Sequence, residues 1–480
     1  MKNSILLFVL LLSVSLTSMA TDRLVVENGL APAYSSISAA VAAASAGDRI
    51  FIENRGGNIP WFENVTINKS LDIVAFVNDS IFICQGNWTI SGGSTPINVN
   101  IIGMYNLAGS VTSSADATNP RDTIRLLGGA LLNGQVNFNN NNYDLTVYGM
   151  KVIYNGAAAN QEAAVVLRHG RVVGDSIVTT DGASGIWAVT EATVTNDTAY
   201  ITGNVIWQQD PSVSEGAGYG AEFYGIGINW QSNSEFFDIR NNLVYFYNKG
   251  LYTSTSRASG AAINKIYNNT AIWYNNSQNY GYYFSPNGYG DGTYGWSGMI
   301  VETGGSGSII EVMNNIIAKT TANPATQYTQ YGFFGIPNGG SVNVYYNYFS
   351  TTGTTANQWV TAYIGGTETV NTDNNGTTTL AAFGGGPTVG NLTGNQVPTY
   401  PPPTTNLGWC TTLGGGGGNT GSMYDNLNLT TNTVGAYGGS YTLLNYFPQN
   451  TGATRSWMLY YPFNANVGTT INIQGSAFDR

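Results

Sequence analysis

The ionisable side chains best placed for acid–base chemistry lie in "LRHGRVVGDS", residues 167–176, which contains Arg168, His169, Arg171 and Asp175. His169 is the only histidine in the chain, and an imidazole oriented by a carboxylate can act as a general base. If the run is extended, alternation puts Arg168 on the face opposite His169 and Arg171. The competing interpretation is a turn with a solvated basic edge, and the pattern favours that interpretation.

A second candidate is the pair Glu215 and Glu222 in "SEGAGYGAEFYG". Two carboxylates on either side of a glycosidic bond can serve as acid and base. The sequence does not give their separation, and a flexible acidic loop is the favoured alternative. The acids of the chain show no calcium-loop spacing, so no metal site is predicted.

Two segments dense in Tyr, Trp and Gly, 207–230 and 279–296, have the character of insertions. Aromatic rings on loops offer flat amphipathic surfaces that suit the apolar faces of sugars. The alternative is that they pack on the flank of the fold as a lid. The predicted carbohydrate-binding residues are Trp207, Tyr219, Tyr224, Trp230, Tyr280, Tyr282, Tyr283, Tyr289, Tyr294 and Trp296.

The elements that must position these residues are short strands. "YSSISAAVAAASAGDRIFIE", residues 34–53, predicts a helix capped by Ser35 or Ser36, stopped at Gly47 and followed by a strand. No other segment predicts a helix, and strand-like runs recur from there on. Low charge (9%) with 61 Gly and 31 Tyr is typical of a β-rich chain, and 42% hydrophobic residues make disorder improbable.

Five strand-like runs share one asparagine at an equivalent place, and the intervals between them are 38, 27, 46 and 32 residues. Self-similarity on this scale indicates a solenoid with insertions. In a coil of parallel strands, such amides can stack and satisfy polar groups at the corner. The predicted structural ladder is Asn204, Asn242, Asn269, Asn315 and Asn347.

The chain resembles the right-handed parallel β-helix proteins of the pectin-lyase-like superfamily. Residues 34–57, with "FENVTINKSLDIVAF" after them, look like the entry of pectin methylesterases, where a helix caps the first coil. "VGAYGGSYTLLNYFP", residues 434–448, is similar to the closing segment of many secreted bacterial β-helix proteins. The resemblance implies an all-β fold: a right-handed parallel β-helix with an N-terminal capping helix and a short C-terminal β segment.

The catalytic patterns of that superfamily do not transfer to this chain. Asn-Thr-Asp occurs once, at 371–373, after the only histidine instead of before it, and there is no Asp-Asp pair and no Arg-x-Lys. No pectin methylesterase run of the "DFIFG" type and no lyase base signature can be placed. No cofactor is expected, and calcium would enter only if the chain were a lyase.

Residues 1–20 predict a signal peptide, with a short apolar stretch followed by small residues at cleavage spacing. Cys84 and Cys410 are expected to be about ten coils apart and unpaired, unless the tail folds back along the coil. A net charge of −10 without a basic run argues against nucleic acid and anionic membranes.

The expected organisation is a β-helix with its cap over residues 21–396, then a Pro/Gly-rich linker and closing β segment over 397–480. Three functional classes remain for this secreted or cell-surface protein. The favoured one is non-catalytic binding of a polysaccharide or cell-surface glycan, or a surface-structural and adhesive role. A polysaccharide-active lyase or hydrolase is the alternative, and a passive repeat scaffold is the third class.

Overall fold

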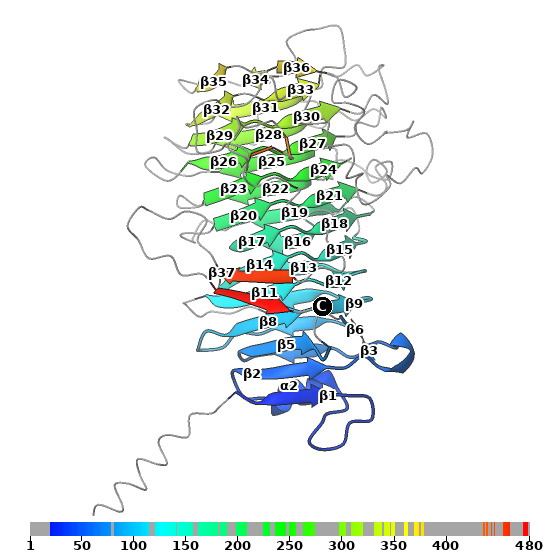
Figure 1. Ribbon diagram of the computed structural model, residues 1–480. Helices are drawn as coiled ribbons and strands as arrows, with labels where there is room; N and C mark the ends of the chain where they lie inside the picture. The colour runs from blue at the N-terminus through cyan, green and yellow to red at the C-terminus, as the bar shows by residue number, and fades with distance from the viewer. Residues whose placement is uncertain are drawn as a thin grey trace, which may run out of the picture.

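The computed structural model of the protein describes part of the chain in detail. The described residues are 20–77, 81–114, 121–140, 142–156, 162–180, 183–189, 198–208, 224–230, 236–245, 249–255, 263–273, 297–303, 309–319, 331–337, 340–345, 347–350, 360–362, 369–373, 376–378, 435–436, 438–439, 443, 446, 455–460 and 474–478. They form a parallel β-helix whose coils stack as successive rungs (Figure 1), so the predicted fold class is confirmed.

Three long parallel sheets, here called A, B and C, make up the faces of the solenoid, and each coil between the two terminal ones contributes one strand to each sheet. Sheet A contains β1 Asp22–Val25, β2 Asp48–Ile52, β5 Leu71–Ala75, β8 Asn98–Ile102, β11 Asp122–Leu127, β14 Tyr143–Tyr148, β17 Gly170–Val173, β20 Thr198–Thr202, β23 Phe236–Arg240, β26 Asn264–Tyr267, β29 Ile309–Met313, β32 Ser341–Tyr345 and β35 Thr369–Asp373. Sheet B contains β3 Trp61–Phe62, β6 Phe82–Gln85, β9 Met104–Asn106, β12 Ala130–Leu131, β15 Lys151–Tyr154, β18 Ser176–Thr179, β21 Val205–Gln208, β24 Leu243–Tyr245, β27 Thr270–Trp273, β30 Ile316–Lys319, β33 Tyr348–Ser350 and β36 Gly376–Thr378. Sheet C contains β4 Val65–Ile67, β7 Trp88–Ile90, β10 Val111–Ser113, β13 Val136–Phe138, β16 Ala163–Leu167, β19 Ser184–Val189, β22 Tyr224–Trp230, β25 Lys249–Thr255, β28 Ser297–Thr303, β31 Tyr331–Pro337 and β34 Val360–Ala362.

The core is the interior of the coil, filled by every second residue of each strand. The strand β5 shows the alternation clearly, with Leu71, Ile73 and Ala75 buried and the residues between them partly exposed. In-register pairing stacks these inward side chains into apolar rows along the axis. One such row in sheet A, with every member at most 1% exposed, is Ile50, Ile73, Ile101, Leu126, Val147, Val172, Ile201, Ile239, Ile266, Val312 and Val344.

A helix covers the N-terminal end of the solenoid, as predicted. The helix α2 spans Ile37–Ala43, and the Ser36 side chain accepts a hydrogen bond from the Ala39 N–H. The Glu63 carboxylate accepts two more of the free N–H groups in the first turn, from Ile37 (2.7 Å) and Ser38 (2.8 Å). The helix ends with an extended residue at Ala44, earlier than the predicted stop at Gly47.

The corner between sheets A and B is a turn of one or two residues whose first residue has a positive φ. Glycine occupies this place in the earlier coils and asparagine in the later ones, both of which tolerate the left-handed region. The residues are Gly103, Gly128, Gly149, Gly174, Gly203, Asn241, Asn268 and Asn314, with φ between 53° and 74°.

The described part of the C-terminal tail lies along this same corner, outside the coil. The Gly435 N–H donates to the Asn314 carbonyl (2.6 Å), and the Ala436 N–H donates to Thr270 Oγ1 (2.9 Å). Further along, the Tyr446 ring packs so close to Gly203 that a Cβ there would meet it at 2.2 Å. The described tail residues with these contacts, Gly435, Ala436 and Tyr446, thus lie beside the solenoid.

The C-terminal β segment exists as an antiparallel pair, β37 Arg455–Tyr460 with β38 Gln474–Phe478. Cys84 is a free, buried thiol, and burial raises its pKa to about 12. Cys410, the predicted signal peptide and the segment 379–434 lie outside the described residues. In the part of the chain that is described, no helix has the length and apolar character needed to span a membrane.

Candidate functional site

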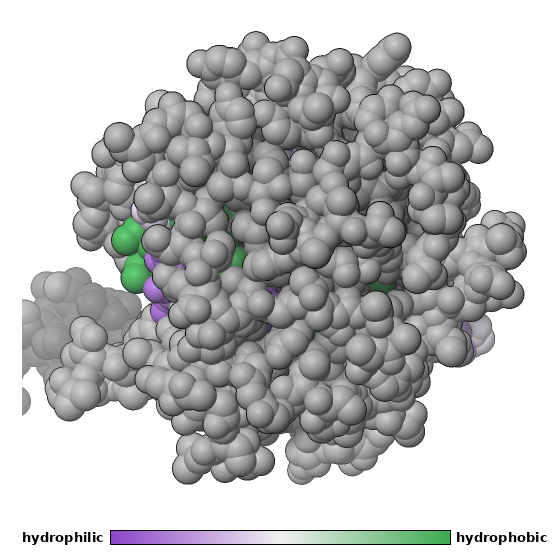
Figure 2. Space-filling view, turned by 90° about the horizontal axis from the view of Figure 1, so that it is seen from above, coloured by the Kyte–Doolittle hydropathy of each residue, from purple (hydrophilic) through white to green (hydrophobic). Residues whose placement is uncertain are grey.

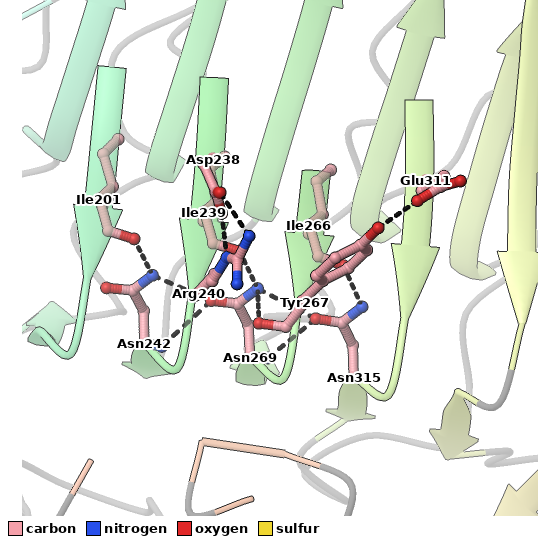
Figure 3. A network of polar contacts seen from close by, with 10 residues as sticks. All are labelled: Ile201, Asp238, Ile239, Arg240, Asn242, Ile266, Tyr267, Asn269, Glu311 and Asn315. Carbon is pink, nitrogen blue, oxygen red and sulfur yellow. Dashed lines mark hydrogen bonds and ion pairs between the residues drawn. The ribbon is translucent and has the colours of Figure 1, made fainter. Parts of the chain in front are cut away.

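The five asparagines chosen from the sequence form one buried row at the A–B corner. Figure 3 shows three of them, Asn242, Asn269 and Asn315. From Asn242 on, each Oδ1 accepts from both the backbone N–H and the Nδ2 of the preceding asparagine; for Asn269 these distances are 3.1 and 2.9 Å, both from Asn242. Each Nδ2 also donates to a backbone carbonyl one coil back, as Asn269 does to Ile239 at 3.0 Å. The same bonds link Asn204, Asn242, Asn269, Asn315 and Asn347, all 0% exposed. Because these amides are buried and bonded to one another, they are not accessible to a ligand.

His169 lies in the turn between β16 and β17, so the run 167–176 is not one extended segment. Its Nδ1 accepts the Thr198 N–H (3.1 Å), and a backbone N–H can only donate, so Nδ1 carries no proton. Nε2 therefore holds the hydrogen and lies 3.9 Å from Asp144 Oδ1. Burial is the main cause that lowers the pKa of His169 to about 4. The positive charges of Arg121 and Arg171 also lower it, and the Asp144 carboxylate acts in the opposite direction. The lone pair that a general base needs is already engaged.

The other members of that cluster are held by neighbours as well. Arg171 lies over the Tyr200 ring, with its guanidinium carbon 5.5 Å from the ring centroid. Arg168 is buried and donates from Nε to Asn139 Oδ1 (2.9 Å), so this part of the turn is not solvated. Asp175 is fully buried in the corner and does not contact the histidine. The expectation of a solvated basic edge is therefore incorrect for Arg168.

The predicted aromatic loops are mostly outside the described residues, as are both candidate glutamates. Trp207 and Tyr224 belong to strands β21 and β22 instead of an insertion, and they are only 6% and 4% exposed. Trp230 ends β22, and its side chain is not described. The residues that lie outside the description are Glu215, Tyr219, Glu222, Tyr280, Tyr282, Tyr283, Tyr289, Tyr294 and Trp296.

Tyr224 belongs to a stacked aromatic cluster on sheet C that the sequence did not reveal. Its ring lies 5.1 Å from that of Trp187 and 4.8 Å from that of Tyr252, centroid to centroid, in stacked geometry. The Trp187 ring covers Gly227, where a Cβ would meet it at 2.2 Å. All three rings are at most 4% exposed, so they pack and do not present a face to solvent.

The outer face of sheet C is different in the first coils, where it is polar, uncharged and exposed to varying degrees. Two side-chain columns run along the axis there, one at the strand entry and one in mid-strand. We call them the sheet C strip, which consists of Asn64, Asn87, Ser110 and Gln135 at the entry and Thr66, Thr89, Thr112 and Asn137 in mid-strand. Asn64, Thr66 and Asn87 are exposed and the rest are half-buried.

The entry column is a second row of side chains bonded to backbone. Asn64 Oδ1 accepts the Asn87 N–H (2.8 Å), Asn87 Oδ1 accepts the Ser110 N–H (2.9 Å), and Ser110 Oγ accepts the Gln135 N–H (3.2 Å). These bonds fix the side-chain amides of Asn64 and Asn87. Within the described part of the chain, neither Nδ2 has a hydrogen-bond partner, and the same is true of the hydroxyls of Thr66, Thr89 and Thr112.

The strip therefore presents oriented donors and hydroxyls, repeated once per coil, or about every 4.8 Å. Its sequence signal is a fourfold quartet, "NVTI", "NWTI", "SVTS" and "QVNF", that begins at residues 64, 87, 110 and 135. The quartet lies outside the repeat defined by the later asparagines, which follow longer and less regular intervals.

The sheet C strip carries no ionisable side chain. Elsewhere in the described ranges, no three His, Cys, Asp or Glu side chains gather as a metal site would require. Seen from above (Figure 2), described residues reach the surface in small areas where hydrophilic and apolar residues adjoin. No family model, no curated protein and no solved structure matches the chain.

Proposed function

We propose that the chain is a secreted or cell-surface member of the pectin-lyase-like superfamily that binds a neutral glycan without cleaving it, in an adhesive or surface-structural role. The observation that carries the proposal is the sheet C strip. The Asn64 and Asn87 amides are fixed by bonds to backbone N–H groups, and the strand register sets the spacing of the threonines. Little side-chain entropy is therefore lost at the two amides when a hydroxyl-rich ligand binds. A polymer lying along the solenoid axis would meet equivalent groups coil after coil.

The charge of the protein supports a neutral ligand over an acidic one. The chain carries a formal net charge of −10, which repels polyanions at low salt. No arginine or lysine stands in the two columns to offset that repulsion. Binding without turnover is supported by His169, whose Nδ1 is occupied by a backbone N–H.

The test measures retention of the purified protein on immobilised neutral and acidic polysaccharides, with reducing ends and unsaturated products assayed in parallel. The variant Thr89→Val/Thr112→Val removes two hydroxyls of the strip and keeps the shape and strand preference of both residues. Each lost hydrogen bond is worth about 1 kcal/mol, so affinity should fall at least about tenfold.

The matched control is Thr123→Val/Thr146→Val, which removes two half-buried hydroxyls from sheet A. It should leave retention unchanged. Equal losses in both variants, or equal retention of the strip variant and the wild type, would overturn the assignment to the strip. Release of reducing ends or unsaturated products would make the protein a polysaccharide-active enzyme.

A further inference from the structure

The buried asparagine row continues for one more coil with an aspartate in place of an asparagine. Asp175 follows Gly174 as Asn204 follows Gly203, and its N–H donates to Asn204 Oδ1 (2.9 Å) in the way that the Asn204 N–H donates to Asn242 Oδ1 (3.1 Å). In the coil before, the Met150 N–H donates to Asp175 Oδ1 (2.7 Å). Asp175 therefore occupies a ladder position and begins the polar row.

The second carboxylate oxygen of Asp175, Oδ2, takes the position of the amide nitrogen Nδ2 in the asparagines of the row. In the row, this amide nitrogen donates two hydrogen bonds: Asn204 Nδ2 donates to the Val172 carbonyl (2.9 Å) and to Asn242 Oδ1 (2.9 Å). Register pairs Val172 with Val147 in the preceding coil, so the corresponding acceptors for Asp175 are the Val147 carbonyl and Asn204 Oδ1.

An ionised Asp175 could not make either bond, because a carboxylate only accepts. Asp175 is 0% exposed, and its Oδ2 is without a hydrogen-bond partner among the described residues. A negative oxygen here would be desolvated and would face acceptor oxygens, whereas a neutral acid has an O–H to donate.

We propose that Asp175 is a protonated carboxylic acid in the folded protein, and that its Oδ2–H donates a hydrogen bond where the other members of the row use an amide. The proton is thus a bound component of the fold at this position. It completes the row at the junction with the apolar corner residues of the earlier coils.

The charged groups around Asp175 do not offer another way to hold a negative charge. Burial raises the pKa of Asp175, and the only opposing influences are backbone hydrogen bonds from Met150 and Val173. The titratable side chains on the neighbouring strands and the packed tail make no contribution to this pKa; they are Lys151, Arg171, Tyr200 and Tyr446.

The pH dependence follows from linkage. The unfolded carboxyl titrates at about 3.9. Burial raises the pKa of Asp175 in the folded protein. The stability that Asp175 contributes is therefore fully present below the unfolded pKa of about 3.9 and is lost as pH rises through the folded pKa. In this window the folding equilibrium constant falls about tenfold per pH unit relative to a chain that lacks the group.

The experiment compares chemical unfolding of the full chain and of Asp175→Asn between pH 4 and pH 9. The two should be closest in stability near pH 4, and the ratio of their folding constants should then grow about tenfold per unit in favour of Asp175→Asn. Asp72→Asn, which removes a carboxylate on the outer face of sheet A, is the control and should show no such growth.

Infrared difference spectra at neutral pH give a direct reading. The wild type should show a carbonyl band of a protonated carboxylic acid that Asp175→Asn lacks and Asp72→Asn keeps. A ratio that stays constant with pH, or absence of that band, overturns the proposal. Failure of Asp175→Asn to fold would also count against it, since an amide supplies the same donor and acceptor.

Discussion

Two rows of side chains run along the solenoid axis, the buried asparagine row at the A–B corner and the entry column of the sheet C strip. Both rows accept hydrogen bonds from backbone N–H groups, but they differ in what the amide nitrogen contacts. In both, an oxygen of one coil accepts a backbone N–H of a neighbouring coil, at 2.8 Å for Asn64 on sheet C and 3.1 Å for Asn269 at the A–B corner. At the buried corner the amide nitrogen then donates to carbonyls and to the next amide. On the sheet C strip it faces solvent.

The difference separates a structural amide from one that is available for binding. A buried amide must use every polar atom, because an unsatisfied group in the interior costs about 1–3 kcal/mol. An exposed amide can leave its nitrogen to water, which a ligand can later replace. The first row is therefore expected to control stability, and the second to control recognition.

The largest effect is expected for Asn269→Ala. Its Oδ1 accepts two bonds from Asn242, and its Nδ2 donates to Ile239 and to Asn315. Removing the amide leaves several buried groups unpaired, so the free energy of unfolding should fall by at least about 3 kcal/mol. Equilibrium urea unfolding measures this change. A decrease in the free energy of unfolding below about 1 kcal/mol would mean that the buried amides do not form the described hydrogen bonds.

A second, smaller effect is expected where the tail covers the buried row. Leu443 is fully buried, and Asn241 Nδ2 donates to the Ala436 carbonyl (3.0 Å). Leu443→Ala should cost about 2–3 kcal/mol locally and should speed hydrogen exchange of the Gly435 and Ala436 N–H groups. If exchange at Gly435 and Ala436 is unchanged while the whole solenoid is destabilised, the tail does not unfold independently of the solenoid.

Most of the architecture was predictable from the sequence, because its signals are local or strictly periodic. The capping helix follows from Ser36 and the apolar spacing after it, and the position of the asparagine row follows from the repeat. The accessible site was not predictable in the same way. Trp207 and Tyr224 have the composition of recognition loops, but their burial depends on contacts across coils that no local pattern encodes.

The fold-back of the tail depends on contacts even further apart. The Asn241 side chain bonds a carbonyl 195 residues away, and nothing in "VGAYGGSY" specifies which corner it meets. Asp175 was noted only as a neighbour of His169 in sequence. The turn between β16 and β17 and the coil geometry place the two in different environments.

For the exposed row, Asn87→Ala is expected to be mild. It removes the acceptor of the Ser110 N–H (2.9 Å), but that bond lies at the surface, where water can replace it. The free energy of unfolding should drop by about 1 kcal/mol or less, well short of Asn269→Ala in the same urea series. Equal losses for the two variants would remove the distinction between the buried row at the A–B corner and the exposed row of the sheet C strip.

The smallest expected change, and the sharpest reading of local geometry, is a shift in the titration midpoint of His169. Its Nδ1 accepts a backbone N–H from the next coil, as the Oδ1 atoms of Asn64 and Asn87 do on the sheet C strip. Because burial lowers the folded pKa to about 4, from an unfolded value of about 6.5, its contribution is present above pH 6.5 and is lost as pH falls towards 4. As the only histidine in the chain, it gives one pair of imidazole C–H resonances, whose titration midpoint should lie near 4. Asp144→Asn removes the carboxylate that raises this pKa and should lower the midpoint further, whereas a midpoint near 6.5 would show that the ring is solvated and that its nitrogen remains available as a base.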